Sequence, residues 1–339
     1  MANKHHDYDA LPTDAHAPSW LLEMRVVMVV LAFVLVLELI ARIIAPVLDF
    51  DRENIFAFPK VIENLEEKAD QSGNPKVVFF GNSLMLHGLD QELVQSELEV
   101  IDGPEIESAK VTPVGTAMLD WVYLYRRYFT DTDSHPDYLV VGFVAHHIHD
   151  QEAIKLRRLS RHFVAGEDLP VLWETDLQDF HSISQSVLCH VSALEGDQPE
   201  HQLGILQTLI ADYKAGLNRN NRLVADGRKR KQQFAIEKDP GKAVPTDDQE
   251  SYDRMKRFIA EAIKHGVKIF FVPMPQPEVW DFNPEAQKII EAEGMTVLDA
   301  RRIPGMTPED FSDGYHLGET GKVKFSEWMA GQLKDQMGE

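Results

Sequence analysis

The amino-acid sequence predicts an α/β fold, a three-layer sandwich with a mainly parallel central sheet, preceded by an N-terminal transmembrane helix. Three observations predict it: one long apolar run near the N-terminus, short apolar runs that end in turn residues, and helical patterns between those runs. The chain has 339 residues and is 44% hydrophobic, which is enough for a large core. Its formal net charge of −21 disfavours nucleic acid as a partner, because phosphate binding needs a basic face.

The long apolar run extends from Val26 to Leu48 and contains two charges. A helix needs about 20 mostly apolar residues to cross a bilayer, so residues 20–50 predict a single-pass membrane anchor. Trp20 and Phe50 stand where interfacial aromatic residues would lie. Residues 1–19 form a polar tail before the anchor. A cleaved signal peptide and a buried core helix are the alternative interpretations.

The two charges inside this run, Glu38 and Arg42, are four residues apart and therefore share one face of a helix. They predict either an ion pair that reaches to the membrane surface or a docking face for a partner membrane protein. Basic residues flank the run on both sides, so their distribution does not decide the orientation of the anchor.

Short apolar runs bounded by turn residues predict the strands of a buried parallel sheet. These runs are Lys76–Phe80, Ala109–Val114, Tyr138–Val144 and Lys268–Val272, with Thr296–Leu298 as a fifth candidate. Helical patterns lie between them, and a last helix is expected over residues 320–336.

The same patterns predict the organisation of the chain after the anchor. Residues 51–75 predict a helical connector, and residues 76–339 predict the α/β domain, with a helical insertion at about 151–249. Within the insertion, the basic segment 218–233 is either a solvated helix face or a ligand surface. The lone cysteine, Cys189, excludes an intramolecular disulfide and is expected to be a buried apolar thiol.

Two segments carry residues suited to nucleophilic catalysis. Ser83 follows a predicted strand on a tight turn, Gly81-Asn82, so its hydroxyl is expected at the carboxyl edge of the sheet, where α/β folds place their sites. Asp313 and His316 precede the last helix, at a spacing that lets the carboxylate orient the imidazole. The alternatives are a helix cap for Ser83 and a turn-stabilising pair for the other two.

These two blocks, Gly81-Asn82-Ser83-Leu84 and Asp313-Gly314-Tyr315-His316-Leu317, resemble the first and last blocks of the SGNH hydrolases, also called the GDSL family. The resemblance covers roughly residues 76–150 and 266–337 and implies a flavodoxin-like sheet. It implies Ser83 as the nucleophile, His316 as the general base and acid, and Asp313 as its orienting carboxylate. No metal or organic cofactor is implied.

The resemblance also implies an oxyanion site formed by the backbone N–H groups of Ser83 and Gly115. The family's third block supplies an asparagine after the third strand, but here Val144-Ala145-His146-His147 stands at that place. Two alternatives follow: one oxyanion donor is missing, or His146 or His147 replaces it as an N–H donor. The family's usual aspartate in the first block is also replaced, by Asn82.

Membrane-anchored members of this family are often acyl-ester hydrolases or O-acyltransferases of the cell envelope, and some work beside a multi-spanning acyltransferase. The resemblance thus implies an acyl-ester or polysaccharide substrate and a domain on the outer, periplasmic or extracytoplasmic side of the membrane. Two alternatives stay open. One is a degenerate scaffold that binds a polysaccharide or a membrane protein, and the other is a metallohydrolase centred on residues 146–150.

Overall fold

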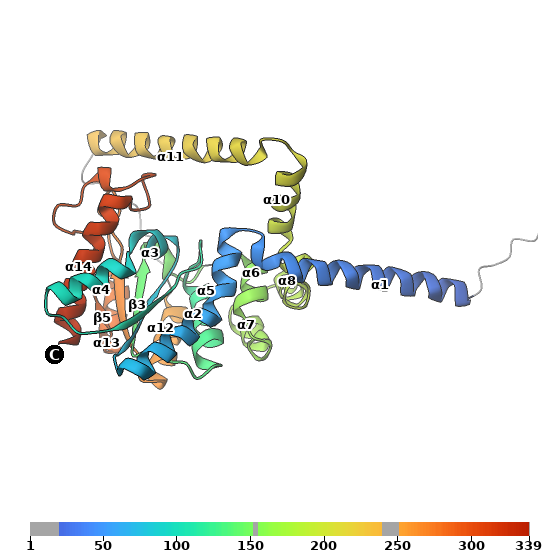
Figure 1. Cartoon of the computed structure of the whole chain (residues 1–339), viewed down its shortest axis with the longest axis horizontal. Helices are drawn as coiled ribbons and strands as arrows, with labels where there is room; N and C mark the ends of the chain where they lie inside the picture. The colour runs from blue at the N-terminus through green and yellow to red at the C-terminus, as the bar shows by residue number, and fades with distance from the viewer. Residues whose placement is uncertain (1–19, 152–154, 239–250, 339) are drawn as a thin grey trace, which may run out of the picture.

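The computed structural model describes residues 20–151, 155–238 and 251–338, and these form one parallel sheet with helices on both faces (Figure 1). The strand order is β2-β1-β3-β4-β5, and every neighbouring pair is parallel. This order reverses direction between β1 and β3, the position where open α/β sheets place their ligand crevice. The predicted fold class is confirmed. The strands are β1 (Lys76–Phe80), β2 (Glu107–Val111), β3 (Tyr138–Phe143), β4 (Lys268–Pro273) and β5 (Thr296–Val297).

The two faces of the sheet bury alternate residues of each strand, as the pleat requires. In β1, Val78 and Phe80 face one core, whereas Val77 and Phe79 face the other. The first core is covered by α2 (Phe50–Ser72), α5 (Met118–Tyr125), α12 (Asp253–Lys264) and α13 (Pro284–Ala292). The second is covered by α3 (Ser83–Gly88), α4 (Gln91–Val100) and α14 (Glu319–Met337).

The expected connector, residues 51–75, coincides with α2, which is part of the first layer and not a separate link. Its apolar side chains Ile55, Phe58 and Ile62 lie in the core. The helix begins at Asp49, whose side chain accepts a hydrogen bond from the backbone N–H of Arg52 at 2.8 Å. It ends at Gly73, whose left-handed backbone (φ 75°) closes the last turn.

The second strand differs from the sequence prediction, because it spans Glu107–Val111 and not Ala109–Val114. Pairing with β1 sets these limits, since Glu107 lies opposite Lys76 and Val111 opposite Phe80. An apolar run alone could not indicate this, because the strand begins with polar residues.

Between β3 and β4 the described residues are mainly helical. In Figure 1, α10 and α11 form an arm that leaves the body near the end of α1 and runs back above α3. In the basic segment 218–233, Arg219 and Arg228 are exposed, and the side chains of 218 and 229–233 lie outside the described residues. Cys189 is fully buried. The helices are α6 (Leu156–Arg158), α7 (Leu169–Thr175), α8 (Phe180–Val191), α9 (Ala193–Gly196), α10 (Gln198–Leu209) and α11 (Tyr213–Lys238).

Several short helical turns connect these elements. A π-helical turn extends α5, and another follows α6. These turns are Ala45–Val47, Arg126–Thr130, Ala145–His147, Leu159–Phe163, Gly166–Asp168 and Pro308–Asp310.

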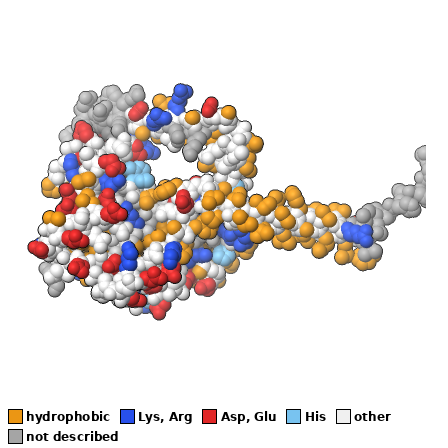
Figure 2. Space-filling view, in the orientation of Figure 1, with side chains coloured by type: hydrophobic (Ala, Val, Ile, Leu, Met, Phe, Trp, Pro, Cys, Tyr) orange, Lys and Arg blue, Asp and Glu red, His pale blue; other side chains and the backbone are white. Residues whose placement is uncertain are grey.

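The N-terminal helix α1 (Trp20–Ile44) projects away from the body (Figure 1). The segment Glu23–Val47 is long and apolar enough to cross a membrane, with 6% of its most apolar window buried. Exposed apolar side chains cover α1 in the space-filling view (Figure 2), and Val29 and Leu35 are about two-thirds exposed. This exposure excludes the alternative of a buried core helix.

The charged pair of α1 docks on the chain's own α8–α9 turn. Glu38 accepts hydrogen bonds from Ser192 Oγ (2.9 Å) and from the backbone N–H groups of Ala193 (2.7 Å) and Leu194 (3.2 Å). Arg42 pairs with Glu38 at 2.9 Å and donates to the carbonyl oxygen of Val191 at 2.6 Å. The predicted ion pair is therefore present, and in this structure both of its side chains also bind the α8–α9 turn of the same chain.

Candidate active site

Ser83 is the first residue of α3 and directly follows the turn at the carboxyl end of β1. Gly81 makes this turn with φ 145°, and a Cβ atom there would lie 2.7 Å from the carbonyl oxygen of Gly142 in β3. Only glycine allows so close an approach. Asn82 caps α3, because its side-chain oxygen accepts from the backbone N–H of Leu84 at 3.0 Å. The cap interpretation thus fits Asn82 and leaves the Ser83 hydroxyl for other contacts.

Ser83 Oγ lies 2.9 Å from His316 Nε2, and His316 Nδ1 lies 2.9 Å from Asp313 Oδ2. Asp313 Oδ1 also accepts from the backbone N–H groups of Tyr315 (3.0 Å) and His316 (2.7 Å). With Nδ1–H donating to the carboxylate, Nε2 is left to accept the serine proton. The three residues therefore have the geometry of a nucleophile, its base and an orienting acid.

The loop that carries Asp313 and His316 is closed by backbone hydrogen bonds. Ser312 N–H donates to the carbonyl oxygen of His316 at 2.9 Å, and Gly318 N–H donates to that of Asp310 at 2.7 Å. Burial raises the pKa of Asp313, but the hydrogen bonds and charge of His316 outweigh it, so the pKa is below its ordinary value. The carboxylate therefore stays ionised at neutral pH beside the imidazole.

Gly115 lies in the loop after β2 with a left-handed backbone, φ 63°. The Arg158 guanidinium holds this loop, because its Nη2 donates to the Gly115 carbonyl oxygen at 2.8 Å. Thr116 ties it to the serine turn: Thr116 Oγ1 donates to the carbonyl oxygen of Gly81 (3.2 Å), and Asn82 Nδ2 donates to that of Thr116 (3.1 Å). The two loops expected to supply backbone donors are thus linked to one another.

His147 is buried beneath this link. Its Nδ1 accepts from the backbone N–H of Val144 at 3.1 Å and lies 3.1 Å from Asn82 Nδ2. Burial and the neighbouring histidines hold the pKa of His147 well below its ordinary value, so the ring is neutral. His146 is exposed and packs against His147, with ring centroids 4.1 Å apart. Among the described contacts, none joins either histidine to Ser83 or His316.

The described residues after β3 show no cluster of metal ligands. Within the described part of the chain, no three His, Cys, Asp or Glu side chains converge. Asp150 instead caps α12, accepting from the backbone N–H groups of Asp253 (2.7 Å) and Arg254 (3.0 Å). The metallohydrolase alternative thus lacks a ligand set there.

Sequence reasoning missed three residues around the candidate site. His87 packs edge-on against His316, and Ser83 and His87 are four residues apart, so helical spacing could have indicated this neighbour. Thr116 and the Asn82 amide connect the two loops, and no sequence signal indicates that long-range link. The charge of Arg228 in α11 acts to lower the pKa of the Tyr315 phenol, but burial dominates and raises that pKa.

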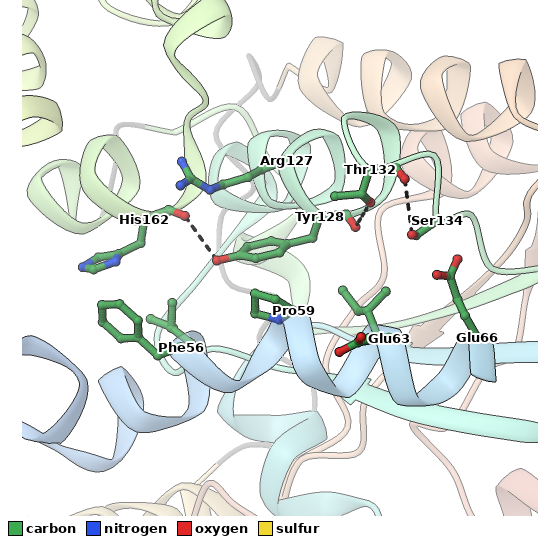
Figure 3. A pocket seen from close by; sticks show the side chains of 11 residues that line it. Phe56, Pro59, Glu63, Glu66, Arg127, Tyr128, Thr132, Ser134 and His162 are labelled. Atoms are coloured by element: carbon green, nitrogen blue, oxygen red, sulfur yellow. Dashed lines mark hydrogen bonds between the residues drawn. The ribbon is translucent and has the colours of Figure 1, made fainter. Parts of the chain in front are cut away.

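A separate cavity of about 360 Å³ lies between α2 and the turn after α5, and Figure 3 shows its lining. Phe56 and Pro59 of α2 face Tyr128 across it, and His162 closes one end. None of the residues near Ser83 contributes to this cavity. It is therefore distinct from the candidate active site.

No family model matches the sequence, and no curated protein matches it. Among solved structures, a lipase/acylhydrolase from Enterococcus faecalis is 12% identical with a TM-score of 0.37, covering 77% of this chain and 96% of that one. A catalytic mutant of an acetylxylan esterase from Geobacillus stearothermophilus is 10% identical with a TM-score of 0.36, covering 76% and 94%. An α/β hydrolase from the metagenome of Lake Arreo, Spain, has the same identity and score, covering 76% and 96%. At these identities and TM-scores the likenesses indicate neither an activity nor a substrate for this chain.

Proposed function

We propose that this chain is a membrane-anchored serine esterase or O-acyltransferase of the SGNH type, acting on an acyl ester such as an acylated envelope polysaccharide. The observation that carries the proposal is the continuous chain of contacts from Ser83 Oγ through His316 to Asp313, with 2.9 Å at each step. A serine hydroxyl is a weak nucleophile at neutral pH unless a base removes its proton, and this arrangement supplies that base.

The reaction follows from the positions of these groups. Ser83 Oγ attacks the ester carbonyl carbon while His316 Nε2 takes the hydroxyl proton, and Asp313 stabilises the resulting imidazolium. The backbone N–H groups of Ser83 and Gly115 bind the oxyanion. His316 then returns the proton to the leaving alcohol, which leaves an acyl-serine. A water molecule or an acceptor hydroxyl attacks this ester by the same steps in reverse order.

Labelling with a serine-reactive fluorophosphonate tests this proposal. We expect one adduct, located by mass spectrometry on the peptide that contains Ser83, and its loss in Ser83→Ala and His316→Ala. Ser96→Ala is the matched control, because this exposed serine of α4 bonds only the nearby Leu93 carbonyl oxygen among the described contacts. Labelling that persists in Ser83→Ala would contradict the proposal.

A degenerate binding scaffold is the competing function, and the replaced third-block asparagine is the observation in its favour. The Ser83–His316 contact argues against the binding scaffold, because a protein that only binds has no need of an oriented base. One measurement distinguishes the two functions. A scaffold binds polysaccharide but forms no acyl-serine from an activated ester, whereas the enzyme forms it.

The proposal also includes the orientation of the membrane anchor and the source of the acyl groups. We place α1 across the membrane with the body on the outer, periplasmic or extracytoplasmic side, where envelope polymers lie. A multi-spanning acyltransferase would be the partner that delivers acyl groups if the reaction is transfer. Incubating the acyl-enzyme with an acceptor oligosaccharide, and separating acylated oligosaccharide from free acid, distinguishes transfer from hydrolysis.

A further inference from the structure

The docking of α1 fixes part of the body at a defined level along the anchor. The Glu38 carboxylate accepts from the backbone N–H groups of Ala193 and Leu194, and Arg42 donates to the carbonyl oxygen of Val191. Ala41 and Ala45 are buried at the same junction. The end of α8 and the start of α9 therefore lie beside Glu38 and do not move freely relative to α1.

The length of α1 places that level at the edge of the hydrocarbon. The hydrocarbon core of a bilayer is about 30 Å thick, which a helix crosses in about 20 residues at 1.5 Å per residue. Counted from Glu23, where the candidate span begins, this distance ends near Ile43. Glu38 then lies within about 10 Å of the far boundary. The α8–α9 turn that binds it must lie there too.

The outward face of α8 has the composition of an interfacial helix and not of a solvated one. Phe180, Val187 and Val191 recur on one side of the helix, and Phe180 is 84% exposed. Leu188 flanks them and is also exposed, while Ser186 and Cys189 face the body. The helix contains no Lys, Arg, Asp or Glu. An exposed apolar stripe without charged residues is unusual for a face in bulk water.

The next helix, α10, adds a second apolar strip near the end of the anchor. Its start is tied to α2, because Arg52 pairs with Glu200 at 2.9 Å, and Gly204 lies against the Leu48 side chain. Figure 1 shows α10 rising beside the point where α1 leaves the body, and Figure 2 shows apolar side chains along that side. The exposed apolar residues are Ile205, Leu206, Leu209 and, just after the helix, Ile210.

We propose that these exposed apolar side chains of α8 and α10, here called the membrane-side face, lie in the boundary between lipid headgroups and acyl chains. The proposal rests on the proposed membrane span of α1. Lipid is the occupant because this face is continuous with the exposed apolar surface of α1, at the depth where the span ends. The body is then held to the bilayer at two places, and the edge of the sheet that carries Ser83 keeps a fixed orientation to the membrane.

Quenching by brominated lipid tests this depth in the full-length chain. Two variants that each add one exposed cysteine, Val187→Cys and Leu209→Cys, are labelled with a small fluorophore and reconstituted in phosphatidylcholine vesicles with brominated acyl chains. Val30→Cys, in the middle of α1, is the reference inside the bilayer. Val100→Cys, at the end of α4 and 75% exposed, is the control in water. The parent chain gives the background, because its one cysteine is buried.

We expect fluorescence losses at positions 187 and 209 of the same order as at position 30, and no loss at position 100. Quenching at 30 but not at 187 and 209, with both open to a water-soluble thiol reagent, overturns the proposal and leaves the anchor standing. Unquenched positions that are protected from that reagent also overturn it, because a second copy or another protein then covers the face. Absence of quenching at position 30 removes the membrane span itself.

Discussion

The imidazole of His87 lies edge-on against that of His316, with ring centroids 5.5 Å apart and planes at 83°. His87 is one helical turn after Ser83 on α3, so one short helix carries both the serine and this neighbour of its base. Burial is the main cause that lowers the pKa of His87, and the charge of His316 adds to it. His87 is therefore neutral at neutral pH and supports His316 by packing.

This contact predicts that His87 positions the base without reacting itself. His87→Ala removes the supporting ring, and we expect kcat to fall about tenfold, because small errors in placing a catalytic group cost rate. KM should change little. His87→Phe restores an aromatic edge without a titrating group and should recover most of kcat. Steady-state kinetics with an aryl acetate measure both variants, and equal losses in the two would show that the ring contact does not matter.

The contact between Ser83 and His316 predicts that the two residues act as one unit. Ser83→Ala and His316→Ala should each lower kcat/KM by 10⁴-fold or more, an order-of-magnitude estimate, and the double variant should be no worse than either. Asp313→Ala should lower kcat/KM by roughly 10²-fold less than these variants, since Asp313 orients the base without contacting substrate. Additive losses in the double variant would mean that Ser83 and His316 act in separate steps.

The hydrogen bond that the Asn82 amide donates predicts a specific defect when a carboxylate takes its place. Asn82 Nδ2 donates to the Thr116 carbonyl oxygen at 3.1 Å, and a carboxylate would instead repel that oxygen. Asn82→Asp should thus loosen the Gly115 loop and lower kcat by roughly 10-fold. It should also raise the pKa of the adjacent His147, which NMR titration of the ring can follow. An unchanged His147 pKa would argue against this coupling.

Much of the sheet could be predicted from the sequence, because buried parallel strands are nearly continuous apolar runs. Lys76–Phe80 is β1 as expected, and the predicted third and fourth strands differ from β3 and β4 by one residue each. The β2 limits could not be predicted, because pairing with β1 sets them. The serine and histidine blocks were visible as local motifs. The contacts of Glu38 with α9 and of Asn82 with Thr116 join segments distant in sequence, and no local pattern encodes them.

A buried carboxylate in the insertion predicts how stability depends on pH. Asp176 accepts from Tyr123 Oη, Arg254 Nε and Arg257 Nη2, each at 2.7 Å, and its side chain is 1% exposed. Burial raises its pKa, but these donors outweigh burial, so the folded-state pKa lies below the unfolded value of about 3.9. The stability from ionising Asp176 is therefore complete above that value and is lost as pH falls through the folded pKa.

Asp176→Asn should then lower the free energy of unfolding by about 2 kcal/mol at neutral pH, because the partly buried guanidinium groups of Arg254 and Arg257 lose their counterion. The difference from the parent chain should shrink below about pH 4. Urea unfolding in detergent at several pH values measures it. Asp133→Asn is the control, since it removes the same charge from a side chain that is 97% exposed. A pH-independent difference would contradict this account.

Gly73 and Gly81 both have a positive φ, but only Gly81 lies close to β3. We therefore expect the two positions to tolerate alanine very differently. Gly73 has φ 75° with nothing within 4 Å of a new Cβ, so Gly73→Ala should cost only the left-handed strain, about 1 kcal/mol. At Gly81 the new Cβ would lie 2.7 Å from the Gly142 carbonyl oxygen, which is backbone and cannot turn away. Gly81→Ala should therefore lower the free energy of unfolding several times more than Gly73→Ala, as measured by urea unfolding.

Gly81→Ala should also displace Ser83 from His316. We therefore expect kcat in its folded fraction to fall, while kcat of Gly73→Ala stays at the parent value. Equal destabilisation of the two variants, with full activity in both, would show that the approach of β1 to β3 does not position the serine.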